Sequence, residues 1–398
     1  MRELRDILSQ LVALRGRGEP AAVATVVRVR GSTYRREGAR LLIEASGRTV
    51  GSISGGCLEG DVAEIARDVL ATGRPRLVNY DMTSDDDAVW GLGLGCNGAI
   101  DVFVEAVVDA RGDEAVALLR DSVEHRRTIV LVTVIAAPTG GAEVGARLIV
   151  PADPDGGGVR GTLGDPPLDA RARAAVRDQL AVGRSEVLTL EAPGGPVEVF
   201  VEVVSSPLPL LVCGAGHDTL PVVRLGHELG WWVMVADSRP AFASRERFPE
   251  ADEVVLTDDA DVPTKVRIDP ETFVILMTHN YLHDLSLLRG LLGTPARYIG
   301  LLGPRRRTER LLADLAKEGV VVDDAQRARL YAPVGLDLGA ETPEEIALSV
   351  LAEMLAVRNG RAAVSLRERP GPIHEVAHAA TEPAGTAAAA RNVVVCQE

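Results

Sequence analysis

The first half of this 398-residue chain contains an internal repeat, and the repeat limits the folds that the chain can adopt. Residues 38–43 (GARLLI) return as residues 145–150 (GARLIV), and residues 101–105 (DVFVE) return as residues 198–202 (EVFVE). A segment that occurs twice is expected to fold as the same supersecondary unit twice. We therefore expect two similar units in succession, here called copy one and copy two.

The spacing between matching positions shows where the copies differ in length. The offset is 147 − 40 = 107 residues at the first match and 184 − 74 = 110 further on, so copy two has about three extra residues around positions 151–158. At the closing strand the offset falls to 202 − 105 = 97. Copy one thus contains about 13 residues (110 − 97), between Tyr80 and Ala99, that copy two lacks.

Hydrophobic periodicity predicts the same elements in both copies. Each copy has an expected helix (4–16 and 114–125), apolar strands, a second helix (58–73 and 168–183) and closing strands. This order of elements indicates an α+β unit that has been duplicated.

Three polar, glycine-rich segments distinguish copy one from copy two. They are residues 31–38 (GSTYRREG), 54–59 (SGGCLE) and 90–98 (WGLGLGCNG), and copy two has ordinary loop residues in their place. Binding residues concentrate on loops that a rigid scaffold carries. Features that only one copy has are therefore better explained by a ligand than by folding.

The residue types in these segments suit an anionic ligand. Gly55 and Gly56 precede an expected helix, whose first N–H groups and dipole favour an anion. Arg35 and Arg36, on the same turn as Ser32, add donors that bind phosphate or other oxyanions bidentately. We predict that these five residues hold the charged groups of a cofactor.

Cys57 and Cys96 are the candidate metal ligands. Cys57 lies near the expected helix start, which favours a thiolate, and a thiolate is a soft ligand for molybdenum or copper and a carrier of sulfur. Cys96 lies in the extra segment of copy one, which we expect to fold toward the same point. The alternative for both is a small buried hydrophobic residue.

From residue 207 onward strands alternate with helices, which is typical of a doubly wound parallel sheet. The apolar strand at residues 210–213 is followed by Gly214, Gly216 and His217 at a helix start, and Asp237 lies 237 − 214 = 23 residues after the first glycine. This layout predicts a dinucleotide turn, with the pyrophosphate on the helix start and Asp237 on a ribose hydroxyl. The third glycine of the motif is replaced by Thr219. Because Arg239 lies near Asp237, the sequence does not decide whether NAD or NADP would bind.

Later strand ends join this candidate site, because open α/β sheets bind ligands at the carboxyl ends of their strands. His279 follows the expected strand 273–278, and Gly300 and Gly303 lie at the end of the strand 297–302. The glycines would let the backbone approach a ligand. His279 has the alternative of a polar residue that ends a strand.

The predicted fold is α/β: a duplicated α+β N-terminal region followed by a Rossmann-like, doubly wound parallel-sheet domain. We expect its regions to span residues 1–110, 111–206 and 207–361, with a disordered tail at 362–398. Thr342, Pro343 and Glu345 form a helix-start signature, so a helix is expected from there to about Asn359.

Charge, cysteine spacing and the length of apolar runs limit the partners and the location that we expect for the protein. The formal charge of −14 and the pI near 5.1 disfavour nucleic acid. The four cysteines are far apart, which argues against disulfides and structural zinc. The N-terminus lacks the apolar run of a signal peptide, and the longest apolar run, residues 128–137, is too short to span a membrane. We therefore expect a cytoplasmic protein without a membrane span.

The motifs together resemble the XdhC/CoxI family over most of the chain to about residue 361. The N-terminal ones are residues 31–40, 51–59 and 93–96, and the C-terminal ones are residues 214–217, 278–279, 298–303 and 332–347. The resemblance implies a chaperone that binds the molybdenum cofactor in its molybdopterin form and supports its sulfuration with a cysteine desulfurase. It further implies delivery to a client, a molybdenum hydroxylase such as xanthine or carbon monoxide dehydrogenase. Thr219, Asn97 and Pro304 depart from the family pattern.

Two other functions stay open. An NAD(P)-dependent oxidoreductase would use the C-terminal domain, with Cys57 or His279 in acid–base or redox work, and a nucleotide-sensing module would bind without catalysis. A chaperone without turnover of its own is the preferred interpretation, and we expect a homo-oligomer.

Overall fold

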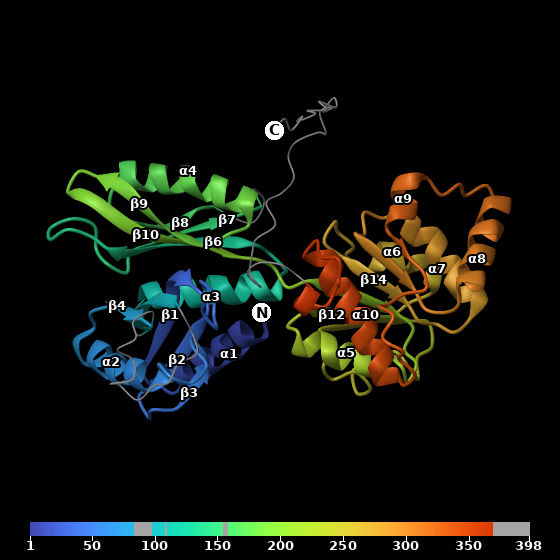
Figure 1. The fold of residues 1–398 in the computed structure, drawn as a ribbon, viewed down its shortest axis with the longest axis horizontal. Helices are drawn as coiled ribbons and strands as arrows, with labels where there is room; N and C mark the ends of the chain where they lie inside the picture. Colours follow the sequence, from blue (N-terminus) through green and yellow to red (C-terminus); the bar gives the residue numbers. More distant parts are fainter. Residues whose placement is uncertain (83–97, 108–109, 154–157, 369–398) are drawn as a thin grey trace, which may run out of the picture.

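The computed structural model describes residues 1–82, 98–107, 110–153 and 158–368, and Figure 1 shows their arrangement. Two antiparallel sheets with their helices form the N-terminal part, and a parallel sheet covered by helices forms the C-terminal part. The polypeptide passes from one part to the other between β10 (Gly195–Val204) and β11 (Pro209–Cys213).

The two antiparallel sheets have the same topology. The first has the order β3-β2-β1-β5-β4, and the second has the order β8-β7-β6-β10-β9. The strands of the first are β1 (Ala21–Gly31), β2 (Arg40–Glu44), β3 (Thr49–Gly51), β4 (Arg76–Asp81) and β5 (Gly98–Ala106). Those of the second are β6 (Ile129–Ala136), β7 (Arg147–Pro151), β8 (Arg160–Thr162), β9 (Glu186–Ala192) and β10. The predicted duplication is therefore present in the fold.

Four helices complete this part in layers. Helix α2 (Glu59–Thr72) packs on one face of the first sheet, and α4 (Pro166–Val182) packs on one face of the second. Helices α1 (Arg2–Gly16) and α3 (Ala110–Glu124) contact each other and lie between the two sheets (Figure 1). The inner faces of the sheets also meet directly, where Phe103 and Phe200, at equivalent positions of the two copies, pack together.

Two ion pairs cross between the copies at equivalent positions. Arg40 of copy one donates to Glu202 of copy two at 2.5 Å, and Arg147 of copy two donates to Glu105 of copy one. The side chains are 7% to 17% exposed. Arg40 and Arg147 occupy equivalent positions of the repeat, as do Glu105 and Glu202. Each copy therefore supplies one arginine and one glutamate to the contact between copies.

The C-terminal sheet is parallel throughout and has the order β13-β12-β11-β14-β15-β16. Its further strands are β12 (Trp232–Asp237), β13 (Glu253–Leu256), β14 (Phe273–Leu276), β15 (Tyr298–Leu301) and β16 (Leu330–Tyr331). The strand order corresponds to the 3-2-1-4-5-6 order of a Rossmann sheet, whose switch point lies between the first and fourth strands. Here these are β11 and β14.

Helices cover both faces of this sheet. Helices α5 (Thr219–Glu228) and α10 (Pro343–Arg358) pack on one face, and α6 (Val262–Lys265), α7 (Tyr281–Leu292) and α8 (Arg305–Lys317) pack on the other. Helix α10 begins with the predicted capping box of Thr342 and Glu345. The predicted fold class is thus confirmed, while the exact domain boundaries stay a proposal.

The short elements were not predicted. Helix α9 (Asp324–Ala328), the one-turn helix α6 and the two-residue strand β16 are too short for a periodic apolar pattern to show. Across the described part of the chain, every helix is too short or too polar to cross a membrane.

Candidate functional site

The segments that distinguish copy one emerge from the same end of its sheet. Strands β1, β3 and β4 end there, and β2 and β5 begin there, as the antiparallel pairing requires. The turn at 31–39 and the loop at 52–58 therefore lie at one end of the scaffold. The predicted segment at 90–98 connects β4 to β5 at this end, but it lies outside the described residues apart from Gly98.

Gly98 shows how the third segment returns to the sheet. A side-chain carbon at this position would lie 2.6 Å from the carbonyl oxygens of Arg30 and Ser32, so only glycine fits. The described end of the copy-one insert thus packs directly beneath the turn that carries Ser32. Cys96, the second predicted metal ligand, lies outside the described residues.

The turn at 31–39 borders an open groove of about 530 Å³ that also involves α1 and the end of β10. Thr33 holds the turn by donating from Oγ1 to the Arg35 carbonyl at 2.7 Å. The two predicted anion ligands differ in this groove. Arg35 is already paired with Glu3 of α1 at 2.6 Å, whereas Arg36 is exposed. Arg36 is thus the better placed of the two to meet a ligand anion.

The loop at 52–58 is anchored by a carboxylate. Glu59, at the start of α2, accepts hydrogen bonds from Ser52 and Ser54 through their hydroxyls and from backbone N–H groups. Burial opposes the ionisation of Glu59, but the hydrogen bonds, led by that of Ser54, outweigh it and hold the pKa below its usual value. Glu59 was singled out in sequence only as part of the motif, and the structure gives it a structural role.

The hydroxyl of Ser54 occupies the position in which an anion was predicted. Its Oγ accepts from the N–H groups of Gly56, Cys57 and Leu58 at 3.1, 3.1 and 3.2 Å. Helix α2 itself begins later, at Glu59. An anion at Gly55 and Gly56 would therefore compete with Ser54, and the prediction of anion binding at this turn stays a prediction.

Cys57 is half-buried and packs against the apolar cluster under the first sheet. Val29 and Ala39, which flank the turn at 31–38, belong to the same cluster. The structure thus places Cys57 at the predicted end of the sheet, and Cys57 is not part of the lining of the groove that Arg36 borders. Within the described residues, no group of three or more metal-binding side chains occurs.

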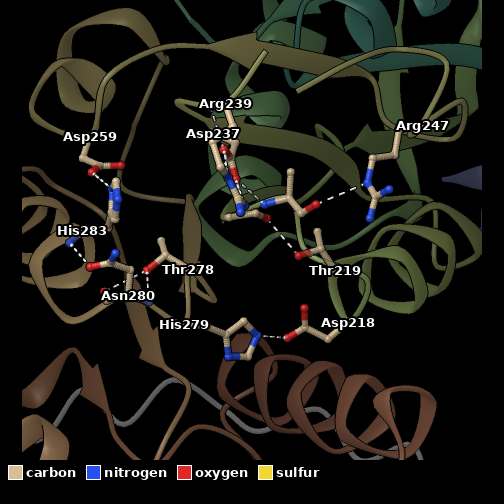
Figure 2. A network of polar contacts seen from close by, with 12 residues as sticks. Asp218, Thr219, Asp237, Arg239, Arg247, Asp259, Thr278, His279, Asn280 and His283 are labelled. Atoms are coloured by element: carbon tan, nitrogen blue, oxygen red, sulfur yellow. Dashed lines mark hydrogen bonds and ion pairs between the residues drawn. The ribbon is translucent and has the colours of Figure 1, made fainter. Parts of the chain in front are cut away.

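The second candidate site lies at the switch point of the parallel sheet (Figure 2). Gly214 follows β11 with a φ of +113°, and a side-chain carbon there would lie 2.6 Å from the Met277 carbonyl oxygen after β14. Glycine is therefore required for the two strand ends to meet. Thr219, at the position of the motif's third glycine, is fully buried and donates to the Gly214 carbonyl at 2.9 Å. The threonine stabilises the turn without opening it.

Asp237, the predicted ribose ligand, is occupied by protein donors. It accepts from the Ala215 N–H at 2.7 Å and from the backbone and guanidinium of Arg239 at 2.7 to 2.9 Å. Burial opposes its ionisation, yet the hydrogen bonds from Arg239 and the backbone outweigh it and lower the pKa. A ribose would have to displace Arg239, so ribose binding by Asp237 remains a prediction.

His279 lies beside the glycine turn, paired with an acid. Its Nε2 lies 2.6 Å from Oδ2 of Asp218, the residue before α5, and its backbone has a φ of +57° (Figure 2). The Asp218 carboxylate also lies against Gly216, because a side-chain carbon on Gly216 would be 2.5 Å from Asp218 Oδ1. His217 is exposed on the same turn.

Three residues of this site were missed in the sequence. Arg247 donates from Nε to the Ala215 carbonyl at 3.3 Å, and its Nη2 is buried without a partner in the described structure. Asp259 pairs directly with His283, and both line a cavity of about 140 Å³ at the switch point. All three lie on loops or a helix start outside any motif, so spacing in the sequence gave no signal for them.

The two remaining predicted glycines lie further along the sheet. Gly300 is inside β15, and a side-chain carbon there would clash with Val334 and Tyr298. The close approach at Gly300 is therefore made by the protein's own side chains. Gly303, with a φ of +124°, precedes α8 and packs against Arg307, which is paired with Asp284 at 2.6 Å.

By its fold, the chain is a duplicated α+β scaffold joined to a Rossmann-type domain, with polar segments at the end of one scaffold sheet and at the switch point. The sequence model of the XdhC and CoxI family matches residues 14–81 and 122–191, one stretch in each copy. The model of the XdhC Rossmann domain matches residues 210–354. The chain belongs to the XdhC and CoxI family.

Similar proteins from bacteria support this assignment. A probable xanthine dehydrogenase subunit of Bacillus subtilis is 32% identical over 348 residues, covering 87% of this chain and 96% of the relative. The molybdenum cofactor insertion chaperone PaoD of Escherichia coli is 24% identical over 354 residues, which cover 89% of this chain and 88% of the relative. A crystal structure of a xanthine dehydrogenase from Bacillus halodurans matches with a TM-score of 0.70 and 33% identity, covering 92% of this chain and 98% of that one.

Proposed function

We propose that this protein is an accessory factor that binds the molybdenum cofactor, supports its sulfuration and delivers it to a molybdenum hydroxylase of the xanthine dehydrogenase type. Its partners are then the client enzyme and a cysteine desulfurase, and it works in the cytoplasm, as a homo-oligomer. The names of two relatives, a molybdenum cofactor insertion chaperone and a xanthine dehydrogenase subunit, support this role.

The observation that carries the proposal is the asymmetry between the two copies. They share sheet order, helices and a pair of reciprocal ion pairs, yet only copy one has the segments with Ser32, Arg36 and Cys57 at the end of its sheet. A scaffold that folds without these segments in copy two does not need them for folding in copy one. A ligand accounts for them.

The residues present suit the cofactor. The groove of about 530 Å³ lies within the range of small-molecule sites, about 300–1,000 Å³. The exposed guanidinium of Arg36 would hold a phosphate or another anionic group. The half-buried thiol of Cys57 offers a soft donor for the metal or for its sulfur. The cofactor itself supplies the molybdenum chemistry when bound, and the protein's residues hold and orient it.

The test is metal and pterin analysis of protein purified from a host that makes the cofactor. The Arg35→Ala/Arg36→Ala protein should lose at least about 1.5–3 kcal/mol of binding free energy, the range for hydrogen bonds to charged groups. Arg173→Ala/Arg177→Ala removes the same charge from exposed positions of α4 in copy two and should bind normally. Unchanged binding by a folded Arg35/Arg36 variant would show that the ligand lies elsewhere.

The nucleotide-dependent alternative rests on the Rossmann strand order and the glycine turn at the switch point. It requires a dinucleotide to bind where Asp218 faces the turn and Asp237 is already bonded. Titration of NAD and NADP, followed by an assay for hydride transfer from an added oxidisable substrate with no other protein present, separates the two functions. Reduction of NAD(P) by that substrate in the presence of the purified protein would replace the chaperone with an oxidoreductase.

A further inference from the structure

The turn between β1 and β2 carries an exposed aromatic side chain. Tyr34 is 70% exposed, more than any other aromatic residue in the described part of the chain. It lines the groove of about 530 Å³ together with Arg36 and Glu37. The turn itself is fixed, because the buried Thr33 donates from its hydroxyl to the Arg35 carbonyl. Tyr34 is therefore held at the groove by its backbone, while most of its ring stays open to a ligand.

The charged side chains of this groove divide into paired and unpaired ones. Arg35 and Arg40 are each paired with a glutamate that also lines the groove. Arg36 and Glu37 have no hydrogen-bond or ion-pair partner among the described residues. One guanidinium and one carboxylate are therefore free for a ligand, on the same turn as the exposed ring.

The matching turn of copy two has none of these three groups. Arg36 and Glu143 match, because the carbonyl of each accepts from the N–H of an alanine three residues later, at 3.1 and 3.0 Å. The next residues, Glu37 and Val144, therefore match as well, and residues 137–142 contain no aromatic side chain. Copy two thus closes its turn with a carboxylate in place of the guanidinium and an apolar residue in place of the carboxylate. Folding of this turn does not require the three groups of copy one.

The three groups complement a pterin that carries an anionic substituent. A pterin is a planar bicyclic ring, and one edge of it presents two adjacent donors, the 2-amino group and N3–H. The two oxygens of a carboxylate can accept from both donors, and a tyrosine ring stacks on a planar heterocycle. In the molybdopterin form of the cofactor this ring is also linked to a phosphate, which suits a free guanidinium.

We propose that this turn recognises the pterin ring of the cofactor, with Tyr34 stacking on the ring and Glu37 accepting hydrogen bonds from its amino edge. Arg36 supplies the positive charge for the phosphate. The inference rests on the proposed function and adds to it which part of the cofactor the groove holds. A small planar ligand is favoured over a protein partner, because all three side chains line one concave site of suitable size.

Calorimetric titration of the full chain with biopterin tests the ring site, since biopterin has neither metal nor phosphate. The matched probe is biolumazine, in which an oxygen replaces the 2-amino group. We expect biopterin to bind below millimolar concentration and at least about tenfold more tightly than biolumazine, as for a hydrogen bond to a charged group.

Substitutions assign the two contacts separately. Glu37→Gln should weaken biopterin binding about tenfold and reduce its preference over biolumazine to about twofold, because the charged acceptor is lost. Tyr34→Leu should weaken both probes about fivefold, the size of an aromatic contact, whereas Tyr34→Phe should bind as the unchanged protein does. Glu309→Gln, at an exposed position of α8 outside the groove, is the matched control and should not alter binding.

The comparison of the two probes requires no substitution, so it tests the inference even if a variant unfolds. Absence of binding at millimolar biopterin, equal affinity for the two probes, or unchanged binding by folded Tyr34→Leu and Glu37→Gln proteins would each overturn it. Normal biopterin binding by a Tyr34→Leu protein that no longer activates the client would assign the ring to protein docking instead. The proposed function has a separate readout, because molybdenum content is measured on protein loaded in the host, whereas biopterin is added to cofactor-free protein.

Discussion

Residues 52–58 of copy one and residues 162–168 of copy two occupy the same place in the repeat, before α2 and α4, but they are held in different ways. In both, a carboxylate in the first helical turn anchors the loop: Glu59 bonds to Ser52, and Asp169 bonds to Thr162. This part of the arrangement is therefore scaffold, because it is present where no ligand is predicted.

The two copies differ in the side chain that accepts hydrogen bonds from the backbone N–H groups just before the helix. In copy two Asp165 is an ordinary N-cap, which accepts from the Leu168 N–H at 3.1 Å, and prolines follow it. In copy one Ser54 accepts from three N–H groups, and Gly55, Gly56 and Cys57 stand between it and the helix. This contrast separates the residues of the motif that serve folding from those that remain for a ligand: Glu59 belongs to the first group, and Gly55 and Cys57 belong to the second.

The largest loss of folding stability is expected when the ion pairs that join copy one to copy two are broken. Glu202→Gln and Glu105→Gln each leave a largely buried arginine, 12% or 17% exposed, without its charged partner, and breaking a fully buried pair costs about 3–5 kcal/mol. Because the pairs are equivalent by duplication, both substitutions should lower the free energy of unfolding by similar amounts in urea titrations.

Replacing a whole pair provides the control. Arg40→Met/Glu202→Leu removes both charges and should cost about 1 kcal/mol or less, since a hydrophobic replacement of a buried pair is often nearly neutral. A cost below about 1 kcal/mol for one glutamine variant and above about 3 kcal/mol for the other would show that the two copies are not energetically equivalent.

The next largest loss of folding stability is expected at the carboxylates that anchor the two equivalent loops, Glu59 in copy one and Asp169 in copy two. Glu59→Ala leaves several donors unsatisfied and should cost about 2–3 kcal/mol, and Asp169→Ala, with fewer bonds, about 1–2 kcal/mol. The folded pKa of Glu59 is below its usual value, so its contribution is complete above the unfolded pKa of about 4.3 and is lost as the pH falls through the lower folded pKa. Urea titrations at pH 7 and pH 3 measure it: the cost of Glu59→Ala should shrink at pH 3.

The fold followed from the sequence because its signals are local or repeated. The capping box at Thr342 and the apolar run before Gly214 are local, and the repeat assigns two sheets from one pattern. The crossed ion pairs could not be predicted, because Arg40 and Glu202 are 162 residues apart and only tertiary packing brings them together.

The sequence predicted several residues of the candidate sites, but it did not predict which partners their side chains bond to. Two motifs identified Arg35 and Asp237, one in each candidate site. Their partners Glu3 and Arg239 decide how much of each side chain is left for a ligand. Arg247 was missed, because it reaches the glycine turn from a loop 32 residues after Ala215. Motifs record residue types, whereas the pairing of charges depends on loops whose paths the sequence does not specify.

The two described cysteines should differ in reactivity. Cys213 in β11 is fully buried, and burial raises the pKa of its thiol, so iodoacetamide at pH 7.5 should leave it unmodified in the folded protein. Cys57 is only half-buried and should be labelled at least about tenfold faster. Mass spectrometry of timed samples measures both rates.

Replacement of Cys57 links its thiol to function. Cys57→Ser should change the free energy of unfolding by about 1 kcal/mol or less, as expected for a small, partly exposed residue, and should lower bound molybdenum and activation of the client. If the variant retains full molybdenum binding and client activation, Cys57 is only a small residue packed on the apolar cluster under the sheet.

The smallest effect on stability is expected at Gly55, where a single residue of copy two can be placed in copy one. Copy two has Asp165 at the equivalent position, the space around a side-chain carbon on Gly55 is open, and its φ is outside the left-handed region. Gly55→Asp should therefore change the free energy of unfolding by about 0.5 kcal/mol or less. Gly56→Asp is the matched control for strain, because its φ of +108° makes any side chain unfavourable. If the loop receives an anionic cofactor, the added carboxylate repels it, and molybdenum content should fall at unchanged stability. Full molybdenum content in the Gly55→Asp protein would mean that this loop, although unique to copy one, does not contact the ligand.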